Sequence, residues 1–281
     1  MNTSFAQFWR RFKKNKLAMI GLVFLAIEIV CAVCAPRITP HDPTKLGLDK
    51  VLLPPGSPGH PLGTDEYGMD VLARLLYGSR ISLSVGLLVI GLSVTIGIIM
   101  GSLAGYYGGW VDALIMRLVD LLAAFPFFVL AISIMAVLGP GLFNVMIALG
   151  SVSWIGYARM VRGQFLALKE KEFVESASAI GCSDWHIIRR YLVPNSLAPV
   201  IVQATLGMGG AILSASGLSF LGLGAQPPTP EWGAMLSAGQ IYIRRAPHLS
   251  TYPGLAIMFT VLAFNFIGDG LRDSLDPRLK Q

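Results

Sequence analysis

Charged residues are scarce in this chain of 281 residues, where Asp, Glu, Lys and Arg make up 14% and apolar residues make up 54%. Soluble globular domains carry about 25% charged residues, so this composition excludes an ordinary soluble protein. The apolar residues gather in runs of about twenty, the length that a helix needs to cross a hydrocarbon core. These runs lack the in-out alternation of barrel strands. The sequence therefore predicts an all-α integral membrane protein.

Other absences narrow the function. No G-x-x-x-x-G-K-[S/T] motif occurs, so the chain has no P-loop for nucleotide phosphates and is expected to be neither an ATPase nor the holder of a cofactor. The three cysteines are expected to be free thiols. His41, His60 and His248 fall in external segments and lack an H-x-x-x-H spacing, so we expect exposed loop histidines and no metal site.

Six transmembrane helices are predicted, and the chain divides around them. The predicted spans cover residues 17–35, 81–105, 118–138, 142–160, 195–224 and 253–270. The expected parts are a cytoplasmic amphipathic lead at 1–16, a first transmembrane anchor at 17–35, an external proline-rich loop at 36–77, a domain of five spans at 78–271 and a cytoplasmic tail at 272–281. Membrane lipid is accordingly an expected partner of the chain.

The net charge of +6 is explained by membrane topology. If the N-terminus is cytoplasmic, 15 of the 22 Lys and Arg residues lie in inside segments: Arg10, Arg11, Lys13, Lys14, Lys16, Arg117, Arg159, Arg162, Lys169, Lys171, Arg189, Arg190, Arg272, Arg278 and Lys280. The positive-inside rule assigns such segments to the cytoplasm, so both termini are expected there. Because these residues lie beside spans and not on a soluble scaffold, no nucleic-acid partner is expected.

A long uncharged run at 192–230 is interrupted by proline and glycine residues. Broken backbone at membrane depth is tolerated only where protein or a water-filled cavity covers it, so this span is expected to end in a re-entrant or interfacial piece near SFLGLG and to line a pathway. Gln203, Ser214 and Ser216 are polar groups that it could offer to a solute. Polar contacts between helices are an equally good explanation for each of them taken singly.

The segment 172–194, EFVESASAIGCSDWHIIRRYLVP, places charges and a central glycine between apolar runs. Gly181 is predicted to end a first short helix as its C′ residue, and Ser183 can cap a second one. Two apolar faces are predicted, one of Phe173, Ala177 and Ile180 and one of Trp185, Ile188 and Leu192. Such a segment either lies in the membrane interface or docks into a groove on another protein.

This segment resembles the cytoplasmic EAA loop of permease subunits of binding-protein-dependent ABC importers. Glu175, Ala177, Gly181 and Pro194 match the family pattern at the right spacing, whereas Ser176, Tyr191 and Val193 depart from it. Seven further stretches resemble the dipeptide/oligopeptide permease subfamily across residues 5–281: PLGTDEYGMDVLARLLYGSRISL, AGYYGGWVDALIMRLVD, FPFFVLA, LGPG, YARMVRGQ, FLGLGAQPPTPEWGAML and FNFIGDGLRDSLDPRL.

The resemblance implies a type I ABC importer transmembrane fold at 78–271, with a cytoplasmic coupling helix, in the bacterial inner (cytoplasmic) membrane. It implies a heterodimer with a homologous permease, two ATP-binding subunits that hydrolyse ATP, and an external solute-binding protein. Glu175 would contact the ATPase cleft, Gly181 would set the angle between the two short helices, and Pro194 would end the segment. Ala177 and Ser183 belong to the same coupling site.

Transport of di- or oligopeptides is the function that the resemblance implies. Two alternatives stay open at this point: a permease of the same subfamily for another solute such as nickel, and a secondary transporter. A secondary transporter would be expected to show inverted repeats, and no convincing repeat is found in the sequence.

Overall fold

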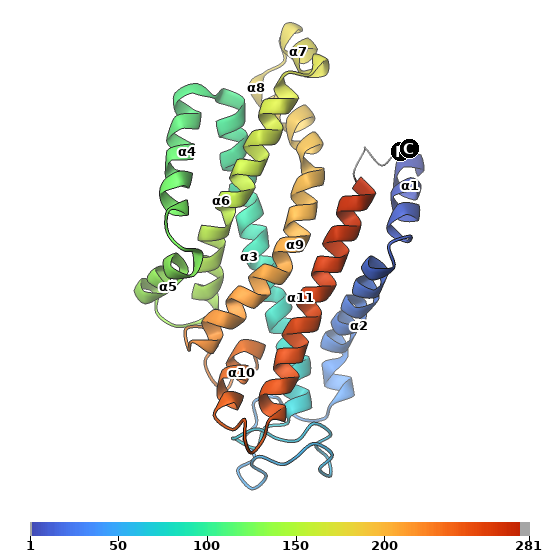
Figure 1. Cartoon of the computed structure of the whole chain (residues 1–281), viewed down its shortest axis with the longest axis vertical. Helices are drawn as coiled ribbons and strands as arrows, with labels where there is room; N and C mark the ends of the chain where they lie inside the picture. The colour runs from blue at the N-terminus through green and yellow to red at the C-terminus, as the bar shows by residue number, and fades with distance from the viewer. Residues whose placement is uncertain (1, 276–281) are drawn as a thin grey trace.

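A computed structural model describes residues 2–275 of the chain (Figure 1). The described residues form helices and connecting loops, with no strand among them. Long helices run side by side, with α7 and α8 at one end of the molecule and α10 and the α2–α3 loop at the other (Figure 1). Of the predicted tail at 272–281, residues 276–281 lie outside the described part.

The helices follow the predicted apolar runs. Their bounds are α1 Asn2–Phe12, α2 Lys16–Ile38, α3 Val71–Tyr107, α4 Gly109–Ala123, α5 Phe127–Leu138, α6 Leu142–Lys169, α7 Glu172–Ala179, α8 Asp184–Ile187, a π-helical turn Ile188–Leu192, α9 Val193–Phe220, α10 Trp232–Gln240 and α11 His248–Leu275.

Within residues 2–275, four helical rods are long and apolar enough to cross a membrane, namely α2, α3, the rod Asp184–Phe220 and α11. A fifth crossing results if α4 and α5 count together, but these two helices meet at an angle of 91°. The span predicted at 118–138 is therefore not one continuous helix, because it is interrupted between Ala123 and Phe127. Pro126 explains the break, because a proline disfavours helical backbone at the residue before it and provides no N–H.

The predicted span at 142–160 lies within α6, a helix of 28 residues that also carries basic side chains. Helix α6 makes its most extensive contact with α3. Gly101 and Gly105 of α3 allow this approach, since a Cβ at Gly105 would lie 2.6 Å from Cβ of Phe165 and one at Gly101 would lie 2.6 Å from the carbonyl oxygen of Ala158. Small residues at such contacts let helix backbones pack closely within a membrane.

Helix α1 and the last turn of α11 lie at the end of the molecule that carries α7 and α8 (Figure 1). Asn15 Nδ2 donates a hydrogen bond to Asp273 Oδ2 at 3.2 Å, which joins the start of α2 to the end of α11. Phe12 is buried against Gly270 in the same region. The two ends of the described chain are therefore neighbours.

At the opposite end, Arg74 of α3 holds the proline-rich loop in place. Its Nε lies 3.2 Å from Asp65 Oδ2, and its Nη1 donates to the carbonyl oxygens of Pro43 and Pro228 at 3.1 and 3.2 Å. Burial raises the pKa of the Asp65 carboxyl, and the neighbouring Arg74 guanidinium only partly opposes this rise. Arg74 thus ties the α2–α3 loop to the connection between α9 and α10.

Candidate coupling segment and pathway

The turn between α7 and α8 has the geometry that the sequence predicts. Gly181 adopts a φ of +82°, the left-handed region that glycine tolerates best. The N–H of Cys182 donates to the carbonyl of Ala177 at 3.1 Å, and the N–H of Gly181 donates to Ser178 at 3.0 Å. These are the two hydrogen bonds of a Schellman motif, so the predicted helix stop at Gly181 is confirmed.

Ser183 occupies the N-cap position of α8, but its side chain makes no capping hydrogen bond, so the predicted hydroxyl cap is wrong. The first turn of α8 is anchored in another way. Tyr106, near the end of α3, donates its hydroxyl hydrogen to Asp184 Oδ1 at 2.7 Å. Lys169 Nζ donates to the backbone carbonyl of Tyr106 at 2.6 Å, so the ends of α3 and α6 meet at the start of α8.

The segment buries one face against the rest of the chain and leaves part of the two predicted apolar faces exposed. A shared apolar cluster contains Val174, Ala177, Ile187, Ile188 and Leu192 of the segment, Val161 and Phe165 of α6 and Val200 of α9. Of the residues on the two predicted apolar faces, Ala177, Ile188 and Leu192 belong to this cluster. Phe173, Ile180 and Trp185 are 41%, 78% and 67% exposed, as a face that meets lipid or a partner would be in the single chain. Helix α7 has two adjacent apolar faces, one with Val174 and one with Phe173. The face with Val174 packs against α6, so the face with Phe173 stays exposed.

The three exposed residues Phe173, Ile180 and Trp185 are called the outer apolar set below. Glu175 is also exposed on α7. Trp185 lines a groove of about 320 Å³ between the end of α3 and the α8 region, together with Tyr107 and Arg189. The segment thus presents large apolar side chains and an acid at the end of the molecule where α7 and α8 lie.

Pro194 does not end the segment, contrary to the prediction. The helical rod runs from Asp184 to Phe220 without a break. A π-helical turn at Ile188–Leu192 precedes the proline, and the N–H of Val193 donates to the carbonyl of Ile188. Pro194 is then accommodated in the first turn of α9, where its missing N–H is tolerated. Helix α8 is therefore continuous with α9 through the π-helical turn.

Two ion pairs that the sequence reasoning did not single out join α4 to α6. Arg162 Nε and Nη2 contact the two carboxylate oxygens of Asp112, each at 2.5 Å. Arg159 Nη2 lies 2.7 Å from Asp120 Oδ1. The sequence offered one hint of these ion pairs, since AGYYGGWVDALIMRLVD contains two acids and YARMVRGQ contains two arginines. Both pairs lie between α4 and α6.

The three polar residues considered for a pathway do not lie together. Gln203 and Ser214 line one cavity of about 250 Å³, with Tyr157 and Ser153 of α6. Ser216 instead borders an apolar groove of about 570 Å³ among α9, α10 and α11. Helix α9 ends at Phe220, within the stretch predicted to be re-entrant, and the short helix α10 follows.

A buried acid that the sequence reasoning missed explains the position of Ser216. Ser216 is 4% exposed and donates to Glu231 Oε1 at 3.4 Å. Glu231 also caps α10 by accepting the N–H groups of Gly233 and Ala234 at 3.0 and 2.9 Å. These contacts give Ser216 a role in joining α9 to α10.

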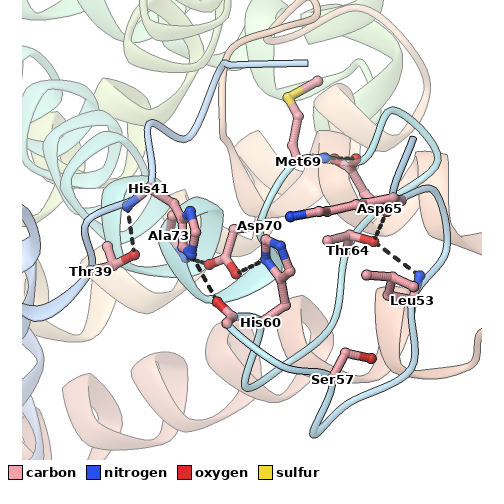
Figure 2. Close-up of polar contacts among 12 residues, drawn as sticks. Thr39, His41, Leu53, Ser57, His60, Thr64, Asp65, Met69, Asp70 and Ala73 are labelled. Atoms are coloured by element: carbon pink, nitrogen blue, oxygen red, sulfur yellow. Dashed lines mark hydrogen bonds and ion pairs between the residues drawn. The ribbon is translucent and has the colours of Figure 1, made fainter. Parts of the chain in front are cut away.

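His41 and His60 were predicted to be exposed loop residues, but both are at least partly buried. His60 is buried, and its Nδ1 lies 2.9 Å from Asp70 Oδ2 (Figure 2). The ring of His41 lies against that of His60, with centroids 4.7 Å apart. No periodic spacing could have revealed this contact, because it depends on the path of an irregular loop.

Comparison with known families agrees with this arrangement. The family described as binding-protein-dependent transport system inner membrane component matches residues 93–281. The N-terminal TM domain of oligopeptide transport permease C matches residues 3–55. A structure of the MetNI methionine ABC transporter in an inward-facing conformation shares the fold, with a TM-score of 0.58 and 20% identity over 72% of this chain and 97% of that chain.

Full-length relatives are much more similar in sequence. The dipeptide transport system permease protein DppC of Alkalihalophilus pseudofirmus is 47% identical, over 97% of this chain and 89% of the relative. The corresponding protein of Haemophilus influenzae is 43% identical, over 99% and 96%. The glutathione transport system permease protein GsiD of Escherichia coli is 47% identical, over 100% and 92%. The chain therefore belongs to the binding-protein-dependent transport system inner membrane components and is an ABC importer permease of the dipeptide/oligopeptide subfamily.

Proposed function

We propose that this permease forms, with a homologous permease subunit, the translocation pathway for small peptides across the bacterial inner membrane. The peptides would be delivered by an external solute-binding protein, and two separate subunits would bind and hydrolyse ATP. Relatives named for dipeptide and glutathione transport, similar over the full chain, support a small-peptide substrate. The lack of a P-loop motif supports ATP hydrolysis on other subunits.

The proposal rests on how the α7–α8 segment is held and which side chains it exposes. It is fixed to the ends of α3, α6 and α9 on one side, and it exposes the outer apolar set on the other. An apolar face of this kind in a short helical hairpin suits docking into a groove on a partner. We infer that the partner is an ATP-binding subunit and that Glu175 contacts it beside the outer apolar set.

We further propose six crossings, with the α4–α5 pair as the third and α6 as the fourth. At 1.5 Å per residue, the 28 residues of α6 extend roughly 40 Å, enough for a hydrocarbon core of about 30 Å. An even number of crossings agrees with α1 and the end of α11 lying at one end of the molecule (Figure 1). The basic residues Arg10, Arg11, Lys13 and Lys14 support a cytoplasmic location for that end.

The mechanism proposed is alternating access. Closure of the ATP-binding subunits would move the docked α7–α8 segment, with Ala177 anchoring α7 and Gly181 and Ser183 forming the turn. The displacement would pass into α9 through the continuous rod that includes Pro194, and into α3 through the bond between Asp184 and Tyr106. Helices α3 and α9 both border the cavity that Gln203 lines. A change in the tilt of these helices would therefore change the side of the membrane from which a solute can enter the cavity.

Gln203 and Ser214 are proposed as the pathway-lining residues of this chain, because both border the cavity between α3, α6 and α9. Ser216 is proposed to serve the link to Glu231 instead. One chain encloses only about 250 Å³ there, so the second permease is needed to complete the route for a peptide.

Purification of the affinity-tagged chain from its native membrane tests the proposal. We expect a complex with a second permease and ATP-binding subunits whose ATP hydrolysis rises when a peptide-loaded binding protein is added. Active transport by the chain without these partners would contradict the proposal. Stimulation by a loaded binding protein that carries only a non-peptide solute would contradict the substrate class but not the assembly.

A further inference from the structure

A cluster of two histidines and one aspartate lies at the end of the molecule opposite α7 and α8. We propose that His41, His60 and Asp70 form a binding site for a divalent transition-metal ion of the Zn²⁺ class. The inference concerns the α2–α3 loop and does not depend on which solute the permease carries. The three side chains come from the start of the loop, its middle and the N-cap of α3 (Figure 2).

The three residues converge closely enough to share an ion. Each offers one ligand atom, and these atoms all lie within 4.8 Å of one another. His60 and Asp70 are 6% and 3% exposed, so two of the three ligands are shielded from competing water. His41 is only partly buried, which leaves an entry route from solvent.

Hydrogen bonds orient both imidazole rings for metal binding. His60 Nδ1 lies 2.9 Å from Asp70 Oδ2, so an ion that replaces the hydrogen between these two atoms can contact both of them. His41 Nε2 lies 2.8 Å from the carbonyl oxygen of Gly59. A carbonyl only accepts, so His41 Nε2 carries the hydrogen and its Nδ1 carries the lone pair. His41 is thereby held with Nδ1 ready to bind, and His60 can bind through Nδ1 once the hydrogen on that nitrogen is released.

The ring placement also fits a shared ion. The centroids of His41 and His60 are 4.7 Å apart. Two imidazoles that bind one Zn²⁺ through bonds of about 2.0 to 2.1 Å hold their centroids roughly 5 Å apart. The ligand atoms of one ion lie about 3.5 Å apart, so the loop has to close by about 1 Å when the ion binds. A rotation of the partly exposed His41 ring can supply most of this closure.

The donor set selects the class of ion. Two imidazole nitrogens and one carboxylate suit Zn²⁺, Ni²⁺ or Fe²⁺, whereas Mg²⁺ and Ca²⁺ prefer oxygen ligands throughout. Asp70 serves as a direct ligand through Oδ2, which lies beside His60 Nδ1. Its other oxygen, Oδ1, accepts the N–H of Ala73 at 2.7 Å and so keeps the N-cap of α3 intact.

A bound ion would tie together three parts of the external end. His41 follows the end of α2 at Ile38, and Asp70 begins α3. The rest of the loop is already held by Arg74, which contacts Asp65 and Pro43. The ion would therefore fix the first span to the second on the side where we propose that the solute-binding protein arrives.

Metal content of the purified full complex tests this site. The complex carries a tag without histidines, is treated with a chelator, and is then dialysed against Zn²⁺. We expect the wild type to retain one more Zn²⁺ per copy of this chain than His41→Phe, which keeps an aromatic ring on His60 but removes a ligand. Affinity for Zn²⁺ at this site should fall at least tenfold in the variant.

His186→Phe is the matched control, because His186 is exposed and lies on α8 at the opposite end. Its Zn²⁺ content should equal that of the wild type. His41→Tyr provides a second variant if His41→Phe assembles poorly. Equal Zn²⁺ content and affinity in the wild type and the His41 variants would overturn the proposal, and so would a wild type that retains no Zn²⁺. The cluster would then be a hydrogen-bonded cap of α3 only.

Discussion

Replacement of Gly181 by valine is the sharpest perturbation of the α7–α8 segment. Gly181 has a φ of +82°, and a Cβ built there meets no atom within 4 Å. A Cβ at this position therefore meets no neighbouring residue, and the main cost of the substitution is in the backbone conformation. A non-glycine residue in the left-handed region costs roughly 1–2 kcal/mol, and a β-branched one lies at the upper end.

Such a cost lowers the population of the native turn by about 5- to 30-fold relative to other turn geometries. The apolar cluster around Phe165 lies on the other side of the segment and should keep the spans assembled. We expect Gly181→Val to reach normal levels in the membrane, to bind the second permease, and to lose most ATP-driven peptide uptake in proteoliposomes. Co-purified ATP-binding subunits should decrease, or their hydrolysis should no longer respond to the loaded binding protein.

Two controls separate coupling from general strain. Gly181→Asn should behave like the wild type, because asparagine tolerates the C′ position. Gly222→Val places the same strain at the opposite end, since Gly222 has a φ of +81° and open space around its Cβ position. Gly222→Val should retain the ATP-binding subunits. Wild-type uptake by Gly181→Val would refute the coupling role of this turn.

Three further predictions concern single contacts. Arg74→Ala leaves the buried Asp65 carboxylate without its ion-pair partner and should lower the free energy of unfolding by about 3–5 kcal/mol. A large drop in the thermal unfolding midpoint of the purified complex would show this loss. Arg162→Ala removes the ion pair with Asp112, in which both side chains are partly exposed, so the free energy of unfolding should fall by only about 1 kcal/mol or less. A larger drop in the unfolding midpoint than for Arg74→Ala would contradict this order of the two ion pairs. Tyr106→Phe keeps the ring but removes the bond to α8, so it should reduce peptide-stimulated ATP hydrolysis more than it reduces assembly, whereas unchanged stimulation would count against this link.

The sequence predicts the long helices well, because a membrane-spanning helix requires a run of about twenty apolar residues and such a run is easy to recognise. Helices α2, α3 and α11 contain their predicted spans, and Gly181 ends α7 as predicted, since a positive φ strongly favours glycine. The span predicted at 118–138 is bent near Pro126, and the bend itself was not predicted although the proline is visible in the sequence.

Other features depend on contacts between distant residues, and no local pattern reveals them. Which face of α7 is buried depends on how α6 ends, so Val174 and not Phe173 packs inward. Ser216 is explained by Glu231, which a separate loop brings beside it. The approach of His41 to His60 follows from the path of the proline-rich loop.

Site-specific photo-crosslinking from position 180 tests the central claim most directly. Ile180 is 78% exposed at the tip of α7, and Ile243, 58% exposed near α10, serves as the control at the opposite end. With a photoreactive residue at each position in turn, we expect position 180 to crosslink to an ATP-binding subunit and position 243 not to do so. Crosslinks from position 180 to lipid alone, with none to an ATP-binding subunit in an active complex, would contradict the assignment of α7 and α8 as the coupling segment.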